Sequence, residues 1–184
     1  KNFKPDIVVS AGGFVAVPVS RAAYDLKIPV MIHQQDVVKG LANRLMEKYA
    51  DLITVNFETS KKDYYPRKTV VIGNPVRPDI LAGDVETARQ IFILKKDRPV
   101  LLIFGGGTGA FKINKMITEI LPQLVANYQV IHLTGKNKQV SDLKHDDYHA
   151  FTFLIDEMKH ALKIADLVVS RAGLNALTEL SCLG

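Results

Sequence analysis

Residues 99–114 read PVLLIFGGGTGAFKIN. Five apolar residues precede four glycines in five positions, and a helical pattern follows, which predicts a strand, a turn and a helix. Glycine permits positive φ and the close approach of an anion, and a helix N-terminus adds unpaired N–H groups and the positive end of a dipole. The stretch therefore predicts a phosphate-binding turn, with a glycine-rich turn that serves packing alone as the alternative.

The same alternation of short apolar runs and helical patterns extends outward in both directions. Most of the runs are continuously apolar, which is typical of parallel sheets with both faces covered. Residues 76–84 contain a proline, a glycine and no periodicity, so we expect two doubly wound α/β units, 1–77 and 78–184, with a ligand site in the cleft between them. We predict strands at 7–10, 29–33, 51–55, 70–72, 100–104, 130–133, 151–154 and 167–170. We predict helices at 15–26, 41–49, 86–92, 111–126, 138–143, 157–164 and 174–183, and a short one capped by Thr59 and Ser60.

Composition narrows the class of protein. No apolar run approaches the roughly 20 residues of a membrane span, and no signal pattern is present, which favours a cytoplasmic protein. The single cysteine, Cys182, reads as a small core residue. A net charge of +5 suits an anionic partner, but the basic residues lack interleaved aromatics, which disfavours nucleic acid. The five histidines complete no recognisable metal-binding motif with a partner residue, so we expect neither a metal nor a cofactor.

Polar residues at the predicted strand ends supply the candidate ligand-binding groups. Arg77 and Arg171 each offer a forked cationic donor to phosphate oxygens, although a surface ion pair is the alternative for both. Glu179 lies two helical turns beyond Arg171, on a face that also carries Asn175, and would accept two sugar hydroxyls or remain a solvated surface residue. His33 ends a buried strand, where a structural role is favoured over proton transfer.

Two common nucleotide-binding motifs are excluded by their missing residues. Gly105, Gly107 and Ala110 match the dinucleotide spacing, but that fold needs an acidic residue at the end of the next strand, and residues 132–135 read HLTG. A Walker loop fails because Ala110 and Phe111 stand where lysine and a hydroxyl residue are required. A sugar nucleotide bound without either motif remains.

At this point the motifs together resemble glycosyltransferase family 28 along essentially the whole chain. The resemblance implies a GT-B architecture of two Rossmann-like domains facing a cleft, with acceptor bound mainly by residues 1–77 and donor by residues 78–184, both domains being incomplete here. The motifs that carry it are KPDIVVSAGGFVAVP (4–18), IPVMIHQQD (28–36), GLANRL (40–45), GNPVR (73–77), GGGTGA (105–110) with Asn114, FLIDEM (153–158) and ADLVVSRAGLNALTEL (165–180).

The activity that this resemblance implies is inverting hexosyl transfer. N-acetylglucosamine would move from UDP-N-acetylglucosamine to an undecaprenyl-pyrophosphoryl-muramyl-pentapeptide in peptidoglycan biosynthesis. The protein would be peripheral, at the cytoplasmic face of the cell membrane, with that membrane surface and the polyprenyl-linked acceptor as partners. A related family 28 enzyme that makes glycolipids, and a UDP-sugar-binding module without turnover, are the alternatives.

The resemblance also implies roles for particular residues. Arg77 and the loop at Gly107 and Thr108 would contact the donor diphosphate. Ile155 would meet the uracil through its backbone, and Glu179 would accept the ribose hydroxyls. The start of the last helix would face the phosphates, and the residue at position 36 would lie near the sugar and the acceptor. The full donor-binding set consists of Asp36, Arg77, Gly107, Thr108, Ile155, Gly173, Leu174, Asn175, Ala176 and Glu179.

The chain departs from the family pattern in three places. Gly107 stands where a serine is common, so Thr108 would have to supply the hydroxyl. The family segment HEQN reads HQQD here, which removes a carboxylate at Gln34 and adds one at Asp36, on the side expected to meet the acceptor. The family's candidate catalytic base lies upstream of Lys1, with His33 and Asp36 as possible acceptor-side residues. We therefore expect a fragment of a longer protein that is inactive alone.

Overall fold

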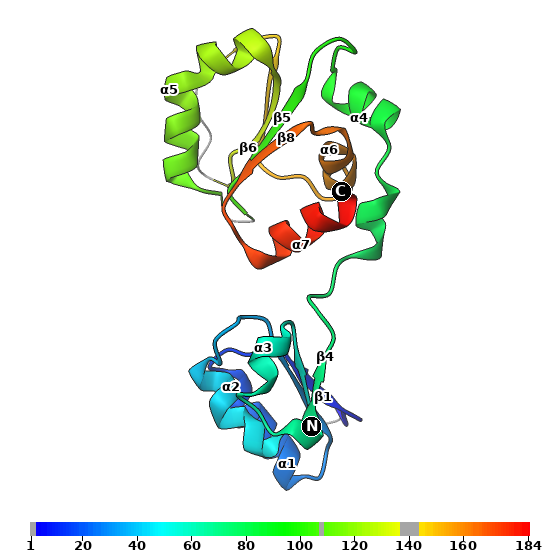
Figure 1. Ribbon diagram of the computed structural model, residues 1–184, viewed down its shortest axis with the longest axis vertical. Helices are drawn as coiled ribbons and strands as arrows, with labels where there is room; N and C mark the ends of the chain where they lie inside the picture. Colours follow the sequence, from blue (N-terminus) through cyan, green and yellow to red (C-terminus); the bar gives the residue numbers. More distant parts are fainter. Residues whose placement is uncertain (1–2, 107–108, 137–143) are drawn as a thin grey trace. The chain divides into compact units, whose positions relative to one another are not determined.

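The computed structural model describes residues 3–106, 109–136 and 144–184 (Figure 1). Contacts between Cα atoms divide the chain into two compact units, Lys1–Pro75 and Val76–Gly184. The sequence-based boundary follows Arg77, whereas this division places Val76 and Arg77 with the second unit. Each unit is an α/β structure around a parallel sheet, which confirms the predicted fold class.

The first unit contains a parallel sheet of order β1-β2-β3-β4. Its helices pack on one face of the sheet, over a core that includes Val30, Ile32 and Ile53. The opposite face carries exposed Val9 and Val70, so helices cover only one face in the described part of this unit. The strands are β1 (Val8–Ser10), β2 (Val30–Gln34), β3 (Leu52–Val55) and β4 (Thr69–Val71). The helices are α1 (Ala16–Asp25), α2 (Leu41–Met46) and α3 (Glu58–Lys61), with 3₁₀ turns at Glu47–Tyr49 and Pro66–Lys68.

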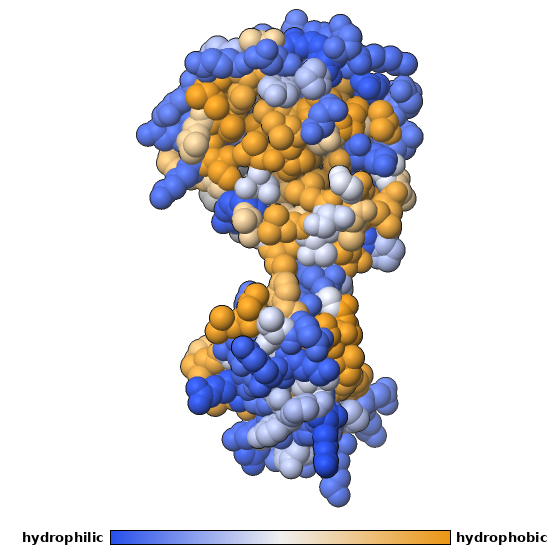
Figure 2. All heavy atoms as spheres, in the orientation of Figure 1, coloured by the Kyte–Doolittle hydropathy of each residue, from blue (hydrophilic) through white to orange (hydrophobic). Residues whose placement is uncertain are grey.

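The second unit has a parallel sheet of order β7-β6-β5-β8 with helices on both faces. Alternate residues of β5 face opposite cores: Leu101 and Ile103 pack against α5, and Leu102 faces the core containing α4 and α6. The outer strand β8 leaves Leu167 and Val169 exposed, and apolar surface lies over it in Figure 2. The strands are β5 (Val100–Phe104), β6 (Gln129–Leu133), β7 (Tyr148–Phe151) and β8 (Leu167–Ser170). The helices are α4 (Val85–Phe92), α5 (Phe111–Asn127), α6 (Met158–Ile164) and α7 (Leu174–Leu183), with a 3₁₀ turn at Pro78–Ala82.

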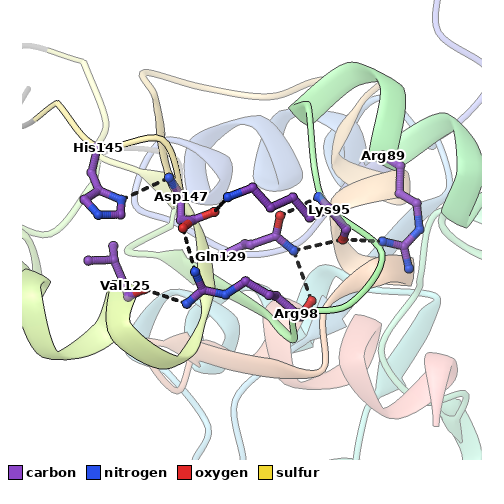
Figure 3. Close-up of polar contacts among 7 residues, drawn as sticks. All are labelled: Arg89, Lys95, Arg98, Val125, Gln129, His145 and Asp147. Atoms are coloured by element: carbon purple, nitrogen blue, oxygen red, sulfur yellow. Dashed lines mark hydrogen bonds and ion pairs between the residues drawn. The ribbon is translucent and has the colours of Figure 1, made fainter.

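A buried carboxylate joins the amino ends of the strands in the second unit (Figure 3). Asp147, immediately before β7, accepts from Lys95 Nζ at 2.8 Å and from Arg98 Nη1 at 2.6 Å. Gln129, the first residue of β6, donates to the carbonyls of Lys95 and Arg98 at 3.1 and 3.0 Å. Arg98 also donates to the Val125 carbonyl near the end of α5. The connection into β5 is thereby tied to two strands and a helix.

Three local predictions were wrong. The strand expected at 151–154 lies at Tyr148–Phe151, because its alternating sequence YHAF is half-buried and the apolar run FTFL follows it. Ser60 does not cap α3, which begins at Glu58; it is buried and its Oγ donates to the Val37 carbonyl. Cys182 is exposed, because α7 packs on the core through Ala176 and Leu180 instead. The helix expected at 138–143 lies outside the described residues.

Candidate functional site

A pocket of about 450 Å³ lies at the carboxyl ends of β5, β6 and β7, beside the first turns of α7. This is the end of a parallel sheet at which α/β proteins bind ligands. Three other depressions in the described part of the chain lie beside the amino ends of strands. The lining residues are Arg77, Phe104, Gly106, Leu133, Gly135, Thr152, Phe153, Leu154, Ile155, Met158, Asn175, Ala176 and Glu179.

Two opposite charges meet in this pocket. Arg77 begins the 3₁₀ turn Pro78–Ala82, and its Nε lies 3.5 Å from Oε1 of Glu179 in the second turn of α7. The Arg77 side chain is 50% exposed and that of Glu179 is 21% exposed. A solvated pair at this separation contributes little to stability. Both groups are therefore available to an anion and to hydroxyls, respectively.

The glycine turn after β5 is shaped by close backbone packing. Gly109 has φ +68°, and a Cβ there would lie 2.3 Å from the Thr134 carbonyl oxygen. A Cβ at Gly105 would lie 2.4 Å from the Ala110 nitrogen. Packing is therefore sufficient to require glycine at both positions, in line with the alternative interpretation of the turn. Gly107 and Thr108, which the sequence assigned to the diphosphate, lie outside the described residues.

Gly106 has a different neighbour. It has φ +81°, and a Cβ at this position would lie 2.9 Å from Nη2 of Arg171, the residue after β8. The missing side chain thus makes room for a guanidinium against the turn. Gly106 also lines the pocket, so a second cation lies close to the pocket wall.

A buried hydrogen-bond network lies beneath this turn. Asn114, in the first turn of α5, donates from Nδ2 to the Thr134 carbonyl at 2.8 Å and lies 3.2 Å through Oδ1 from His132 Nε2. Nδ1 of the same imidazole lies 2.9 Å from the Tyr148 hydroxyl. Because Asn114 Oδ1 can only accept, Nε2 carries the proton and Nδ1 accepts from Tyr148. Burial lowers the pKa of His132 to about 4, so the ring is neutral at pH 7 and joins α5 to two strands.

The residues at the start of α7 divide into two groups. Asn175 and Ala176 line the pocket, whereas Gly173 and Leu174 do not. Gly173 is the extended residue before the helix, and no side chain caps that helix end in the described structure. The first turn of α7 therefore presents its amino end at the pocket edge, where it favours negative charge.

Ile155 lies on the opposite side of the sheet end, in the segment between β7 and α6. It lines the pocket and is exposed. Its backbone N–H donates to Oε2 of Glu157 at 3.2 Å, and its carbonyl accepts from Met158 N. The backbone group that the sequence assigned to the base is thus engaged by a nearby carboxylate.

The remaining candidates lie in the first unit. His33 is buried in β2, with Nδ1 2.8 Å from Thr54 Oγ1, and burial lowers its pKa. The ring is therefore neutral at pH 7 and has a structural role, since it links two neighbouring strands of the sheet. Asp36 is exposed in the turn after β2. Within the described ranges, no group of three or more His, Cys, Asp or Glu side chains is arranged to hold a metal ion.

Sequence reasoning missed several wall residues of the pocket. Thr152, Phe153 and Leu154 lie beyond the end of β7, but the predicted strand was placed three residues late and enclosed them. The half-buried alternation at residues 148–151 was the signal that identifies the true strand. Phe104 was assigned to strand core, although it also reaches the pocket.

Both halves of the chain match models of one enzyme family. The glycosyltransferase family 28 N-terminal domain matches residues 1–55, and the glycosyltransferase family 28 C-terminal domain matches residues 100–184. A curated relative from Lachnospira eligens is 40% identical over 184 residues, which are 100% of this chain and 52% of that protein. One from Bacillus anthracis is 39% identical over 97% of this chain and 51% of its own length. Both are named as UDP-N-acetylglucosamine–N-acetylmuramyl-(pentapeptide) pyrophosphoryl-undecaprenol N-acetylglucosamine transferases.

Solved structures agree with this assignment. The crystal structure of Acinetobacter baumannii MurG superposes with a TM-score of 0.63 at 26% identity, over 97% of this chain and 50% of that one. A UDP-GlcNAc 2-epimerase from Neisseria meningitidis, bound to UDP-GlcNAc, gives a TM-score of 0.69 at 18% identity over 94% of this chain and 56% of that one, which shows the fold alone. The chain spans about half the length of the curated relatives that it matches. With both domain models matched in order along it, the chain belongs to glycosyltransferase family 28.

Proposed function

We propose that this chain is part of a hexosyltransferase that moves N-acetylglucosamine from UDP-N-acetylglucosamine to undecaprenyl-pyrophosphoryl-muramyl-pentapeptide in peptidoglycan biosynthesis. The observation that carries the proposal is the pocket of the second unit, which brings together Arg77, Ile155 and Glu179 at the carboxyl ends of parallel strands. The names of the family 28 relatives support the choice of donor and acceptor.

The diphosphate, the ribose and the base of UDP each have a complementary group in or beside this pocket. The Arg77 guanidinium is a permanent cation with a forked set of donors suited to a diphosphate. Arg171, against the glycine turn, and the amino end of α7 add positive potential on the same side. Glu179 would accept two ribose hydroxyls, and the Ile155 backbone would meet the uracil. Gly107, Thr108, Gly173 and Leu174 complete the proposed donor set with Asn175 and Ala176.

The reaction is a displacement at the anomeric carbon of the sugar. The acceptor hydroxyl oxygen forms a bond to this carbon, and the bond from the carbon to the β-phosphate oxygen breaks. UDP leaves with the electron pair, and the hydroxyl proton passes to a base. The cations around the pocket favour this step because they stabilise charge that grows on the departing diphosphate.

We assign the acceptor to the first unit, with Asp36 near the sugar and acceptor and His33 as a support inside the sheet. A polyprenyl-linked acceptor is held in a bilayer, so the reaction would take place at the cytoplasmic face of the cell membrane, with the enzyme bound peripherally. None of the helices in the described ranges combines the length and apolar character needed to cross a bilayer.

Calorimetric titration tests the donor half of this proposal. The chain is titrated with UDP, UDP-N-acetylglucosamine and CDP, and its thermal unfolding is followed with each ligand. We expect saturable heat and a raised Tm with both uridine ligands, and weaker binding of CDP, because cytosine reverses the donor and acceptor pattern read by a backbone pair. No heat and no thermal shift at millimolar UDP would refute donor binding.

A further inference from the structure

The amide of Gln34, the last residue of β2, is fully engaged inside the first unit. Its side chain is buried, with the residue 2% exposed. Nε2 donates to the carbonyls of Asp36 at 2.9 Å and Val38 at 3.0 Å. Oε1 accepts from Asn43 Nδ2 at 2.7 Å and from the Tyr64 hydroxyl at 2.8 Å. Two donors and two acceptor positions are all that a primary amide has, and each is used.

The turn that follows β2 is held by side chains instead of by backbone pairing. Four consecutive carbonyls, those of residues 35–38, each accept a hydrogen bond from a side chain. The donors are Asn56 to Gln35 at 2.9 Å, Gln34 to Asp36, Ser60 to Val37 at 2.9 Å, and Gln34 to Val38. Gln34 provides two of the four and is the residue that directly holds the Asp36 carbonyl.

A second turn at the same end of the sheet packs against this network. Asn43, which donates to Gln34, is buried in α2, and a Cβ at Gly12 would lie 3.2 Å from its Oδ1. Gly12 has φ +104° in the turn between β1 and α1. Asn43, which is hydrogen-bonded to Gln34, therefore lies against the glycine turn after β1.

We propose that Gln34 is a positioning residue that fixes Asp36 at the ligand-binding end of the first unit. The inference rests on the proposed function, which assigns Asp36 to the sugar and acceptor. The same geometry disfavours a carboxylate at position 34, because two of the four partners are carbonyl oxygens that can only accept. The buried amide of Gln34 therefore holds the backbone of residue 36, whose carboxylate is exposed.

The substitution Gln34→Glu tests the amide requirement directly. The introduced carboxylate would face two carbonyl oxygens in a buried site, so its pKa should rise above the usual value of about 4.3, as burial does for other carboxyls. Below this pKa one protonated oxygen can still donate to a carbonyl, and above it neither oxygen can. Among the described residues around the site, the ionisable groups are neutral Tyr64 and His33, exposed Asp36, and Lys39, which pairs with Glu47 and donates to the Asp63 carbonyl.

The experiment is NMR spectroscopy of the whole chain, with backbone shifts and heteronuclear NOE values measured for residues 35–39 at pH 5 and pH 8. Wild type should be rigid at both pH values. Gln34→Glu should keep more NOE intensity in this turn at pH 5, where the protonated carboxyl retains one of the two donated hydrogen bonds, than at pH 8, where it retains neither. Gln34→Met, which keeps the length without any hydrogen bond, should lose it at both. Gln35→Glu, which adds the same charge one residue along, should remain rigid.

The outcomes separate the inference from the proposed function. A turn in Gln34→Glu that is as rigid at pH 8 as in wild type overturns the positioning role, as does an equal loss in Gln35→Glu. If Gln34→Glu does not fold, rigidity of the turn in Gln34→Met decides the question in the same way. UDP titration of the same variants reports on the second unit and should match wild type. Failure of UDP to bind any of these proteins would refute the proposed function and leave the positioning result intact.

Discussion

The guanidinium of Arg77 and the carboxylate of Glu179 face each other across one pocket, with Nε and Oε1 3.5 Å apart. The distance exceeds that of a well-formed hydrogen bond, and Arg77 is half-exposed, so the pair contributes about 0–1 kcal/mol. A ligand that offers an anion to one partner and hydroxyls to the other can separate them at little cost. The pair therefore lies where the proposed site would receive the diphosphate and the ribose of a nucleotide.

Glu179→Ala should weaken UDP binding without unfolding the second unit. A carboxylate that accepts ribose hydroxyls makes charge-assisted hydrogen bonds worth about 1.5–3 kcal/mol, so the Kd should rise about tenfold or more. Titration calorimetry measures this Kd. A mixture of free uracil and phosphate, which lacks the ribose, serves as the comparison ligand. Glu119→Ala is the matched control, because this exposed carboxylate lies on α5 and pairs only loosely with Lys115. An unchanged Kd in Glu179→Ala would remove Glu179 from the site.

Gly106→Ala should weaken UDP binding through Arg171. The added Cβ would lie 2.9 Å from Nη2 of that guanidinium, and φ of +81° is strained for alanine by about 1–2 kcal/mol. We expect a lower Tm and a higher Kd for UDP than in wild type. Gly40→Ala is the control, because its φ is negative and no atom lies within 4 Å of the new Cβ. Equal Tm and Kd values for Gly106→Ala and wild type would show that the guanidinium does not depend on this gap.

Continuous apolar runs predicted the central strands well. The run 100–104 coincides with β5, because a strand buried on both faces needs an apolar residue at every position. The edge strand β7 was misplaced by three residues, since its side chains alternate between the core and the solvent while the apolar run beyond it lines a pocket. An apolar run indicates that a segment is shielded from water, and both a buried strand and a pocket wall have this property.

The sequence predicts a candidate site residue when the end of a nearby strand places it. It does not predict one that is placed by contacts with distant segments of the chain. Ile155 follows β7 and reaches the pocket at the strand ends, as the rule implies, whereas Arg77 and Glu179 reach the same pocket from a 3₁₀ turn and a helix. The four hydrogen bonds of Gln34 include one from a segment 30 residues away, so no local pattern reveals them. The sequence identified Gln34 only as a missing carboxylate, and its partners supply the physical reason for an amide.

Glu157→Ala should strengthen UDP binding. Its carboxylate accepts from the Ile155 N–H at 3.2 Å, and this donor is the one proposed to meet the uracil. Removing a competing hydrogen bond of about 0.5–1.5 kcal/mol should lower the Kd by about two- to tenfold. Calorimetry with UDP measures the change.

Asp156→Ala is the matched control for this prediction, since it removes the same charge one residue away. Any gain in that variant is electrostatic and should disappear at about 0.5 M salt, where exposed charges are screened. The gain in Glu157→Ala should persist at high salt. Equal behaviour of the two variants would mean that charge alone is responsible and that Ile155 N–H is not a base-recognition group.

Asp147→Asn should destabilise the second unit and reduce its sensitivity to acid. Lys95, as a hydrogen-bond donor, and Arg98, through its charge, hold the pKa of the Asp147 carboxyl below its usual value. A depressed pKa means that the stabilisation is complete above the unfolded value of about 3.9 and is lost as the pH falls from there through the folded value.

The free energy of unfolding should fall by about 2 kcal/mol at pH 7. This value lies between the roughly 0–1 kcal/mol that an exposed ion pair contributes and the roughly 3–5 kcal/mol lost when a buried pair is broken, because Asp147 is buried while Lys95 is half-exposed. Urea unfolding at pH 7 and at pH 3 measures it, and the difference between Asp147→Asn and wild type should shrink at the lower pH. Asp146→Asn removes an exposed neighbouring carboxylate and should match wild type at both. A deficit in Asp147→Asn that is equally large at pH 3 would mean that packing of the side chain, and not its charge, holds the strands at this end of the sheet.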